Sequence, residues 1–444
     1  MDHLSRSDFT KYTRMVDRVT TVRPEGRVSQ VVGLIAEGDS LGLGIGSLCS
    51  ILTDQGEEVK AEVVGFKKQK ALLMPYGDIR GVRMGSRIVP VSASPMVEVS
   101  DQLLGRVIDG MGNPLDGKGS IASSVRYYLY GKPISPLARQ SIAEPLDVGV
   151  AAINSMITLG KGQRVAIMAG SGVGKSVLMG MMTQHTAADV VVIGLIGERG
   201  REVKDFVEQT LKAEGLNRAV VVAATSDMPP LVRMRGAYLA TTIAEYFRDQ
   251  GKHVLLMVDS ITRFAMSSRD VGLAAGEPPT TRGYTPSFFV KIPVLLERAG
   301  NVENSGSITG VYTVLVEGDD LNDPVGDTVR SIVDGHIVLS RDLADKGHYP
   351  AIDVMASVSR VMQDVCGKEH LAVSRQAVSL MAAYRNAEDM ITIGAYVKGS
   401  DPDVDQAIRI MPAINNVVRQ DMGEKKDLPA SVAALKHALE NSKK

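Results

Sequence analysis

The hydrophobic pattern of the first hundred residues predicts a small β-barrel. Residues 27 to 98 contain short β-branched runs that are separated by glycines at close intervals, which is typical of such barrels. The runs expected to form its strands are Val28 to Ile35, Leu48 to Leu52, Val59 to Phe66, Lys70 to Met74 and Arg87 to Val91.

Ahead of the barrel, apolar residues recur at helical spacing. Phe9, Tyr12, Val16 and Val19 would line one face of a short amphipathic helix. That face packs either on its own domain or against a partner, and the pattern alone does not distinguish the two. The first predicted domain, residues 1 to 98, comprises this helix and the barrel.

From residue 99 to residue 362 the pattern changes to apolar strands that alternate with helical stretches, which predicts a largely parallel α/β sheet. The expected strands are Arg164 to Met168, Val190 to Ile196, Ala219 to Ala223, His253 to Val258, Ile308 to Val316 and Gly335 to Leu339. Several are apolar on both faces, as a sheet covered by helices on two sides requires. Residues 363 to 444 read as helical and form the third predicted domain.

Composition mainly excludes classes of protein. A chain of 444 residues is too long for one core, so two or three domains are expected. The net charge of −1 carries no electrostatic footprint of a nucleic-acid partner. The two cysteines, Cys49 and Cys366, match no metal-ligand spacing and indicate inert thiols in a reducing compartment. The N-terminus lacks the apolar core of a signal peptide, and no apolar stretch is long enough to span a membrane.

The strongest local signal is the segment RVAIMAGSGVGKSVLMG, in which an apolar strand runs through a glycine-rich loop into a helix. This is the context of a phosphate-binding loop, with Ala169 in place of the usual first glycine. Glycines let consecutive backbone N–H groups turn inward onto phosphate oxygens, while a lysine reaches the outer phosphates and a serine ligates Mg²⁺. The predicted nucleotide-binding residues are Gly170, Ser171, Gly172, Val173, Gly174, Lys175, Ser176 and Val177.

Turnover needs further groups, and two carboxylates fall at strand ends. Asp259 ends the strand HVLLMVD, and Glu198 follows the strand VVVIGLIG, so both should emerge at the sheet edge where ligands bind. We predict that Asp259 holds the Mg²⁺ shell and that Glu198 polarises the attacking water. Alternatively, Asp259 is only a helix N-cap, and Glu198, Arg199, Arg201 and Glu202 form a solvated charged turn.

A resemblance decides between these alternatives. From LLGRVIDGMGNPLDGKG at 103 to 119 through GAYVKGSDPDVDQAI at 394 to 408, the chain resembles the rotary-type ATPases, with GERGREV, DSITRFA and YPAIDVMASVSRVM in the family's order. Within that superfamily AGSGVGKS, PPTTRGYTPSFF and GSDPDVDQAI most resemble the flagellum-specific export ATPases. The virulence type III secretion ATPases are near relatives. The implied central fold is a RecA-like P-loop NTPase domain.

The resemblance also implies roles for residues. Lys175 and Ser176 would contact phosphate and Mg²⁺, and Glu198 would orient water. Arg199 would contact the terminal phosphate, and Arg263 would lie near the phosphates. Glu202 and Asp259 would hold Mg²⁺ through water, and Tyr349 would stack on adenine. Arg360, in SVSRVM, matches the arginine finger that the family inserts into the neighbouring subunit's site.

The implied function is MgATP hydrolysis by a homohexameric ring that energises or primes flagellar type III protein export and unloads export substrates or chaperones. Implied partners are a stator-like negative regulator at the N-terminal helix, a stalk-like coiled-coil protein in the central channel, and the membrane export gate. The expected location is cytoplasmic, peripheral to the inner-membrane export apparatus. The loop after Gly276, EPPTTRGYTPSFF, is either a pore element or an ordinary solvated connection.

Three alternatives remain open at this point. One is a virulence type III secretion ATPase. Another is a non-catalytic nucleotide-binding ring subunit, which the retained Glu198 disfavours. The third is a hexameric nucleic-acid translocase of the transcription-termination type. Its barrel should carry stacking aromatics, whereas residues 27 to 98 contain only Phe66 and Tyr76 with the short basic run KKQK.

Overall fold

The computed structural model describes residues 24–316 and 323–440, which form two compact units. The first unit comprises the described residues up to Pro95 together with Ala274–Gly276, and the second comprises the remainder. The predicted helix that carries Phe9 and Val19 lies outside the described residues. The division into three domains at residues 98 and 362 stays a prediction.

The first unit is a closed barrel in which the strands follow the order β1-β2-β5-β4-β3-β6. Its strands are β1 (Gly26–Val32), β2 (Ile35–Asp39), β3 (Leu48–Leu52), β4 (Glu58–Lys67), β5 (Lys70–Pro75) and β6 (Arg87–Ser92). Val28, Ile51, Val63, Leu73 and Ile88 fill the interior and are almost completely buried. Burial also raises the pKa of the Cys49 thiol to about 12, so this thiol is protonated at neutral pH.

One strand prediction in the barrel is wrong. The apolar run from Val28 to Ile35 does not form a single strand, because the chain reverses at Gly33 and Val32 pairs with Ile35 across the turn. Gly33 has a φ of +57°, a left-handed conformation that glycine adopts without steric cost. The apolar residues on both sides of Gly33 therefore concealed a tight hairpin.

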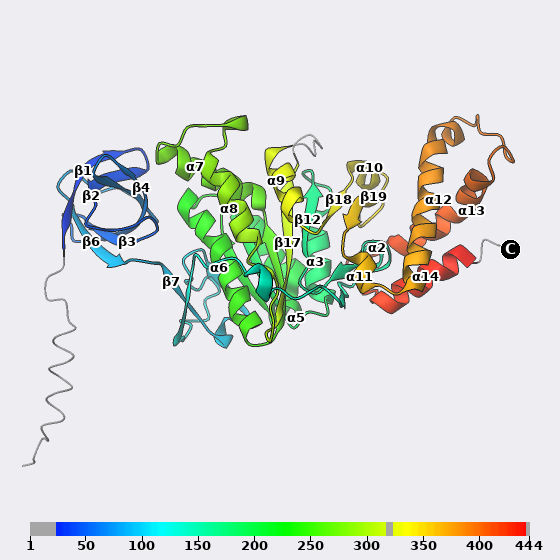
Figure 1. The fold of residues 1–444 in the computed structure, drawn as a ribbon, viewed down its shortest axis with the longest axis horizontal. Helices are drawn as coiled ribbons and strands as arrows, with labels where there is room; N and C mark the ends of the chain where they lie inside the picture. The colour runs from blue at the N-terminus through cyan, green and yellow to red at the C-terminus, as the bar shows by residue number, and fades with distance from the viewer. Residues whose placement is uncertain (1–23, 317–322, 441–444) are drawn as a thin grey trace, which may run out of the picture. The chain divides into compact units, whose positions relative to one another are not determined.

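The second unit is built on a mixed sheet with the strand order β19-β18-β12-β17-β15-β13-β14-β8. Figure 1 labels β12, β17, β18 and β19 of this sheet. Its strands are β8 (Arg106–Asp109), β12 (Arg164–Ala169), β13 (Val190–Ile196), β14 (Ala219–Ala224), β15 (His253–Asp259), β17 (Ser307–Leu315), β18 (Gly335–Leu339) and β19 (Ile352–Ser359), with β16 (Gly300–Asn301) paired to β17. In this order the strands from β18 to β8 run parallel, whereas β19 is antiparallel to β18 and β16 is antiparallel to β17. Short side pairs are formed by β7 (Met96–Val99) with β9 (Val125–Tyr128) and by β10 (Pro145–Leu146) with β11 (Leu159–Gly160).

Helices cover this sheet because its central strands are apolar on both faces. The α-helices among the described residues are α2 (Ala151–Met156), α3 (Lys175–His185), α4 (Gly200–Asp205), α5 (Lys212–Leu216), α6 (Pro230–Asp249), α7 (Ile261–Ala274), α8 (Pro286–Leu296), α9 (Pro324–Ile332), α10 (Arg341–Asp345), α11 (Met362–Val365), α12 (Lys368–Thr392), α13 (Pro402–Val418) and α14 (Leu428–Glu440). A π-helical turn, Phe206–Leu211, joins α4 to α5. The long helix α6 packs across β13, β14 and β15.

The C-terminal helices share the core of the sheet. Figure 1 shows α12 and α13 side by side, with α14 crossing them near one end. Leu380, Ile410 and Leu435 from these helices belong to the same hydrophobic cluster as Val165 and Ile167 of β12. Within the described residues, no helix has the length and apolar content needed to cross a bilayer.

The segment after Gly276 only partly forms a loop. Pro286 begins α8, so the stretch Pro286–Phe289 is the first turn of a helix, with proline in the position where it costs no hydrogen bond. Tyr284 and Phe288 are buried and stack with ring centroids 4.5 Å apart. The two aromatic side chains therefore belong to the packing of this unit, which leaves Pro278 to Gly283 as the exposed connection.

Candidate functional site

The glycine-rich segment forms a loop between β12 and α3. Val165 to Ala169 are buried in the strand, and Ala169 lies in the hydrophobic core, so a Cβ is accommodated at the position where the motif usually has glycine. Gly172 and Gly174 have φ values of +80° and +94°, which favour glycine. The Val173 side chain is buried between them and anchors the loop to the core. Lys175 opens α3, whose N-terminus therefore points at the loop.

The Lys175 ammonium lies between two carboxylates. Its Nζ is bonded to Oδ1 of Asp259 and lies 3.6 Å from Oε1 of Glu198. Asp259, at the end of β15, is buried and also accepts a 2.6 Å hydrogen bond from the Thr313 hydroxyl of β17. β17 separates β12 from β15, so the loop and Asp259 meet across an intervening strand rather than on adjacent ones.

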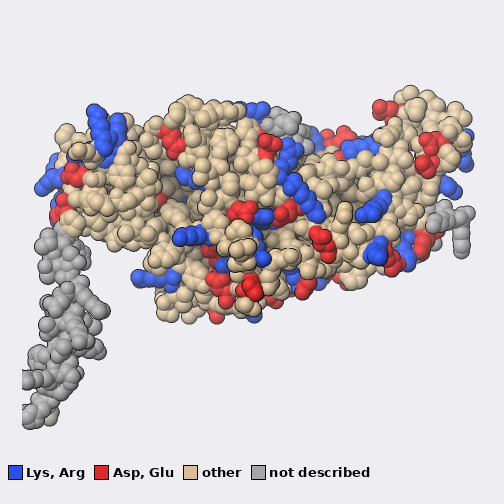
Figure 2. Space-filling model, viewed as in Figure 1, with Lys and Arg blue, Asp and Glu red and all other residues tan. Residues whose placement is uncertain are grey.

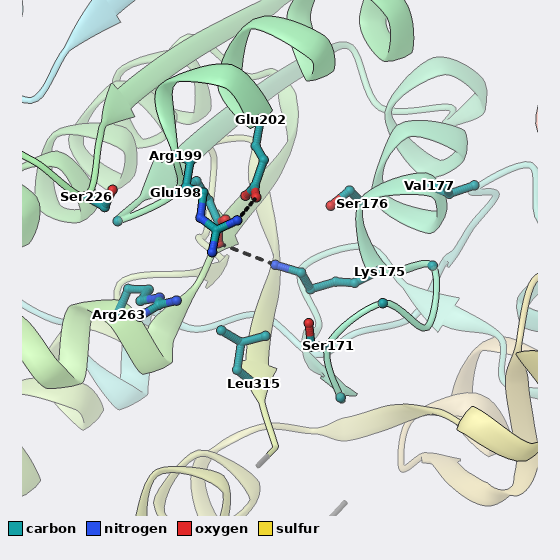
Figure 3. A pocket seen from close by; sticks show the side chains of 14 residues that line it. Ser171, Lys175, Ser176, Val177, Glu198, Arg199, Glu202, Ser226, Arg263 and Leu315 are labelled. Carbon is teal, nitrogen blue, oxygen red and sulfur yellow. Dashed lines mark ion pairs between the residues drawn. The ribbon is translucent and has the colours of Figure 1, made fainter. Parts of the chain in front are cut away.

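The Glu198 carboxyl lies in an environment that favours its protonated form. Burial raises its pKa to about 7; the negative charges of Asp259 and Glu202 contribute to the rise, while the Lys175 ammonium opposes it. Glu202, one helical turn further along, forms a 3.7 Å ion pair with Arg199, whose side chain is largely exposed (Figure 3). A carboxyl group that titrates near neutral pH is suited to accept a proton from water.

Lys175, Glu198, Arg199 and Glu202 line one cavity of about 470 Å³ (Figure 3). It brings together most of the predicted site: Gly170, Ser171, Gly172, Gly174, Lys175, Ser176, Val177, Glu198, Arg199, Glu202 and Arg263. Asp259 lines a smaller cavity of about 190 Å³ that shares Ser176, Glu198 and Glu202 with the first. The predicted residues on β12, β13 and β15 thus converge at the carboxyl edge of the sheet.

The composition of the cavity fits a phosphorylated ligand. Besides the glycine loop and Lys175, the buried Nε of Arg263 has no hydrogen-bond partner among the described residues. A buried guanidinium N–H without a partner is costly unless an anion meets it. In the smaller cavity, the hydroxyl of Ser176 and the carboxylates of Asp259 and Glu202 offer the hard oxygen donors that Mg²⁺ prefers.

Two predicted residues lie outside this cavity. Tyr349 is 47% exposed, and a Cβ placed on Gly174 would lie 3.8 Å from its ring, so the ring stands beside the end of the phosphate loop. Arg360 follows β19 and is exposed. Its backbone N–H donates to the carbonyl of Asp334, which precedes β18 at the amino edge of the parallel strands. Arg360 and the phosphate loop therefore lie at opposite edges of the sheet within one subunit.

Sequence reasoning missed several lining residues. Gly197, Ser226 and Leu315 line the larger cavity, and Thr313 holds Asp259. Gly197 and Ser226 come just after β13 and β14, and Leu315 ends β17. The rule that ligands gather at the carboxyl ends of parallel strands could have identified these three. Nothing in the sequence alone indicates that the Thr313 hydroxyl points toward Asp259.

Family models match the chain in three segments. The nucleotide-binding domain of the ATP synthase alpha/beta family matches residues 149–359, and the beta-barrel domain of that family matches residues 28–91. The T3SS EscN ATPase C-terminal domain matches residues 366–437. A "Flagellum-specific ATP synthase" of Pseudomonas aeruginosa is 48% identical over 98% of each chain. The chain belongs to the flagellum-specific ATP synthase family.

Solved structures of a type III secretion ATPase superpose closely on this chain. The assembled ATPase EscN from the type III secretion system of enteropathogenic E. coli matches with a TM-score of 0.87 and 43% identity, covering 93% of this chain and all of EscN. EscN in complex with its central stalk EscO matches with a TM-score of 0.86 over the same share. The resemblance inferred from the motifs is confirmed. So is the predicted architecture of an N-terminal barrel, a nucleotide-binding α/β domain and C-terminal helices.

Proposed function

We propose that this ATPase hydrolyses MgATP as a subunit of a homohexameric ring and thereby energises or primes flagellar type III protein export. The observation that carries the proposal is the position of Lys175, held between Glu198 and Asp259 beside a glycine loop at a helix N-terminus. In phosphoryl transfer, positioning and charge stabilisation supply most of the catalysis, and these are the groups that supply both.

Each residue of the site has a role in this proposal. The loop residues and Lys175 bind the phosphates, and Arg199 and Arg263 stabilise charge on them. Ser176 would ligate Mg²⁺ directly, with Asp259 and Glu202 acting through water; the ion would neutralise the developing charge between the phosphates. Glu198 orients the attacking water and accepts its proton. Tyr349 stacks on the adenine at the outer end of the loop.

Arg360 completes the site of a neighbouring subunit. Its exposed guanidinium lies at the sheet edge opposite its own phosphate loop, and it makes no hydrogen bond or ion pair with any other described residue. A group placed in this way cannot serve its own site, whereas a ring brings it to the next one. An obligate ring follows from this assignment.

The partners proposed for the ring follow its family. Because EscN has been solved with its central stalk EscO, we propose a stalk-like coiled-coil partner in the central channel here. Export substrates, their chaperones, a stator-like regulator at the N-terminal helix and the membrane export gate complete the set. The ring would work in the cytoplasm, peripheral to the inner-membrane export apparatus. The identities to the flagellar relative and to EscN, 48% and 43%, are close, so a virulence type III secretion ATPase stays the alternative.

A nucleic-acid translocase is disfavoured by the barrel. Tyr76 is buried and hydrogen-bonded to Glu62, so Phe66 is the exposed aromatic of the described barrel residues. In the basic run, Lys67 pairs with Glu37 and Lys70 with Asp39. Over the visible face of the molecule, basic and acidic side chains are interspersed (Figure 2). Single-stranded nucleic acid binds to stacked aromatics in a basic groove.

The test of the proposal is the hydrolysis rate measured against protein concentration, with native mass recorded in parallel. Because the arginine comes from the neighbour, turnover per subunit is expected to rise as rings assemble. Glu198→Gln is the matched variant: it keeps nucleotide affinity and ring mass but loses about 10²- to 10⁴-fold in kcat, as loss of a general base does. Turnover by Glu198→Gln at the rate of the unaltered protein would contradict the base assignment. A fully assembled ring that binds ATP and never hydrolyses it would instead indicate a non-catalytic subunit.

The pH dependence provides an independent test of Glu198. Only its carboxylate form can accept a proton, and its pKa is about 7. We therefore expect kcat/KM to rise roughly tenfold per pH unit below pH 7 and to level off above it. Glu202→Gln removes one of the negative charges that raise this pKa, so it should move the inflection to lower pH. Glu208→Gln, whose carboxylate pairs with Lys204 away from the cavity, should leave the inflection in place. If the inflection stays at the same pH in Glu202→Gln, a group other than Glu198 is titrating.

A further inference from the structure

The start of β12 carries an ion pair that holds the backbone next to Arg360. The Asp334 carboxylate accepts three hydrogen bonds of 3.1 Å from Arg164, one from its backbone N–H and two from its guanidinium. The Asp334 carbonyl in turn accepts the backbone N–H of Arg360 at 2.9 Å. The Arg164 side chain is only 13% exposed, so water screens this pair weakly. These bonds therefore hold the backbone of Arg360 in place.

A second set of bonds holds the residue before Arg360. Gln163 is fully buried; its side-chain nitrogen donates to the Asp334 carbonyl at 3.0 Å and to the Ser359 hydroxyl at 3.2 Å. The Ser359 hydroxyl donates to the carbonyl of Thr158 at 2.7 Å. Asp334, Gln163 and Ser359 therefore form one hydrogen-bonded network, called here the anchor, in which Gln163 is buried and the other two are partly buried. Ser359, at the foot of the exposed Arg360, is held from two sides.

The anchor sits on the strand that ends in the phosphate loop. From Arg164 to Ala169, β12 is paired to β17, and from Ala166 onward it is also paired to β18. A short strand bonded on both sides and buried on both faces moves as a unit. The carboxyl end of β12 therefore leads into the phosphate loop of its own site. Its amino end, at Arg164, is bonded through Asp334 to the backbone of Arg360, which serves the next site.

We propose that Asp334, supported by Gln163 and Ser359, is a positioning residue for Arg360 and makes β12 the connection between adjacent nucleotide sites. The inference rests on the proposed function, since it requires that Arg360 act in the neighbouring subunit. An arginine side chain has several rotatable bonds. Fixing its backbone reduces the conformational entropy that is lost when the guanidinium contacts the phosphates. A displacement of about 1 Å can cost on the order of 10²-fold in rate.

Asp334→Asn tests the proposal with little disturbance to the fold. Asparagine keeps the size of the side chain and the backbone carbonyl, and Arg164 retains its second ion pair, with Glu297. We expect kcat to fall by about 10- to 100-fold through misplacement of the finger. Nucleotide affinity of the variant should be unchanged, because its own phosphate loop is intact. Asp327→Asn is the matched control: it breaks an Asp–Arg pair on the exposed face of α9 and should leave kcat unchanged.

Mixed rings separate a positioning role from a merely structural one. Lys175→Ala subunits have a dead site but an intact finger, whereas Asp334→Asn subunits should have an intact site and a displaced finger. In a random equimolar ring about one boundary in four joins an intact site to an intact finger. The mixture should therefore hydrolyse ATP faster than either parent ring. If Asp334→Asn instead damages the nucleotide site of its own subunit, the mixed rings will show no such recovery, and the proposal is overturned.

A parallel mixture of Arg360→Ala with Lys175→Ala distinguishes the two levels of inference. Recovery there without recovery for Asp334→Asn overturns the anchor alone. No recovery in either verified mixed ring overturns the finger in trans and the anchor with it. Should Asp334→Asn fail to assemble, the same mixing is done with Ser359→Ala, which removes one side-chain hydroxyl from the anchor. There a loss of kcat that is recovered by mixing supports the proposal, and any other result overturns it.

Discussion

Lys175→Ala is expected to abolish measurable ATP hydrolysis. The ammonium is the positive charge that lies among the carboxylates of the site, 3.6 Å from Glu198 and bonded to Asp259. Removing it takes away the contact to the outer phosphates and leaves two acidic groups to repel them. Loss of one preorganised donor to developing charge costs about 10²- to 10³-fold, and loss of a full charge should exceed that. The measurement is steady-state phosphate release from purified rings.

The control for this prediction is another ion-paired lysine. Lys436 of α14 pairs with Glu369 and does not line the nucleotide cavity, so Lys436→Ala should hydrolyse ATP at the rate of the unaltered protein. Thermal melting of both variants checks that the fold survives. Turnover by Lys175→Ala within tenfold of the unaltered protein would mean that the phosphates bind elsewhere.

Arg360→Ala is expected to lower kcat by about 10³- to 10⁵-fold, the range seen when an arginine finger is supplied in trans. Nucleotide affinity should change little, because the finger acts on charge that develops in the transition state, while the phosphate loop and Lys175 of each site stay intact. Arg360→Lys keeps the charge but loses the planar fork that meets two phosphate oxygens, so an intermediate rate is expected. Single-turnover hydrolysis at saturating ATP measures the chemical step directly.

The two variants disable different sites in a mixed ring. Lys175→Ala disables the site of its own subunit, and Arg360→Ala disables the site of its neighbour. Combining the two variants should restore activity that neither has alone. A nucleotide-bound structure of the ring in which Arg360 is remote from every terminal phosphate would contradict the finger, whatever the kinetics of the variant.

Much of the fold could be predicted because buried strands have a clear pattern. β12, β13, β14, β15, β17 and β18 were expected from apolar runs, and the structure places them within one residue of the expected bounds. The failure at Gly33 has the same origin. An apolar run does not record the direction of the chain, and Val32 and Leu34 beside the turn are apolar although the structure leaves both exposed.

The segment after Gly276 illustrates a different limit. Proline and glycine punctuate it, so a long loop was a fair prediction. Pro286 instead serves as the first residue of α8, and Tyr284 and Phe288 are buried. A proline can either interrupt a helix or begin one. Only the packing of the neighbouring helices decides which of the two Pro286 does here.

The sequence by itself determined the chemistry that is available: a glycine loop, a lysine and a serine in consecutive positions, and carboxylates at strand ends. Local spacing suffices for these because a strand, a loop and a helix follow one another within a few residues. The tertiary structure alone decided that Asp259 reaches Lys175 across the intervening β17, that Thr313 holds it, and that burial brings the pKa of Glu198 to about 7. It also placed Arg360 at the far edge of the sheet, on the Asp334 anchor. Strand order and burial arise from contacts between residues distant in sequence, and no local pattern encodes them.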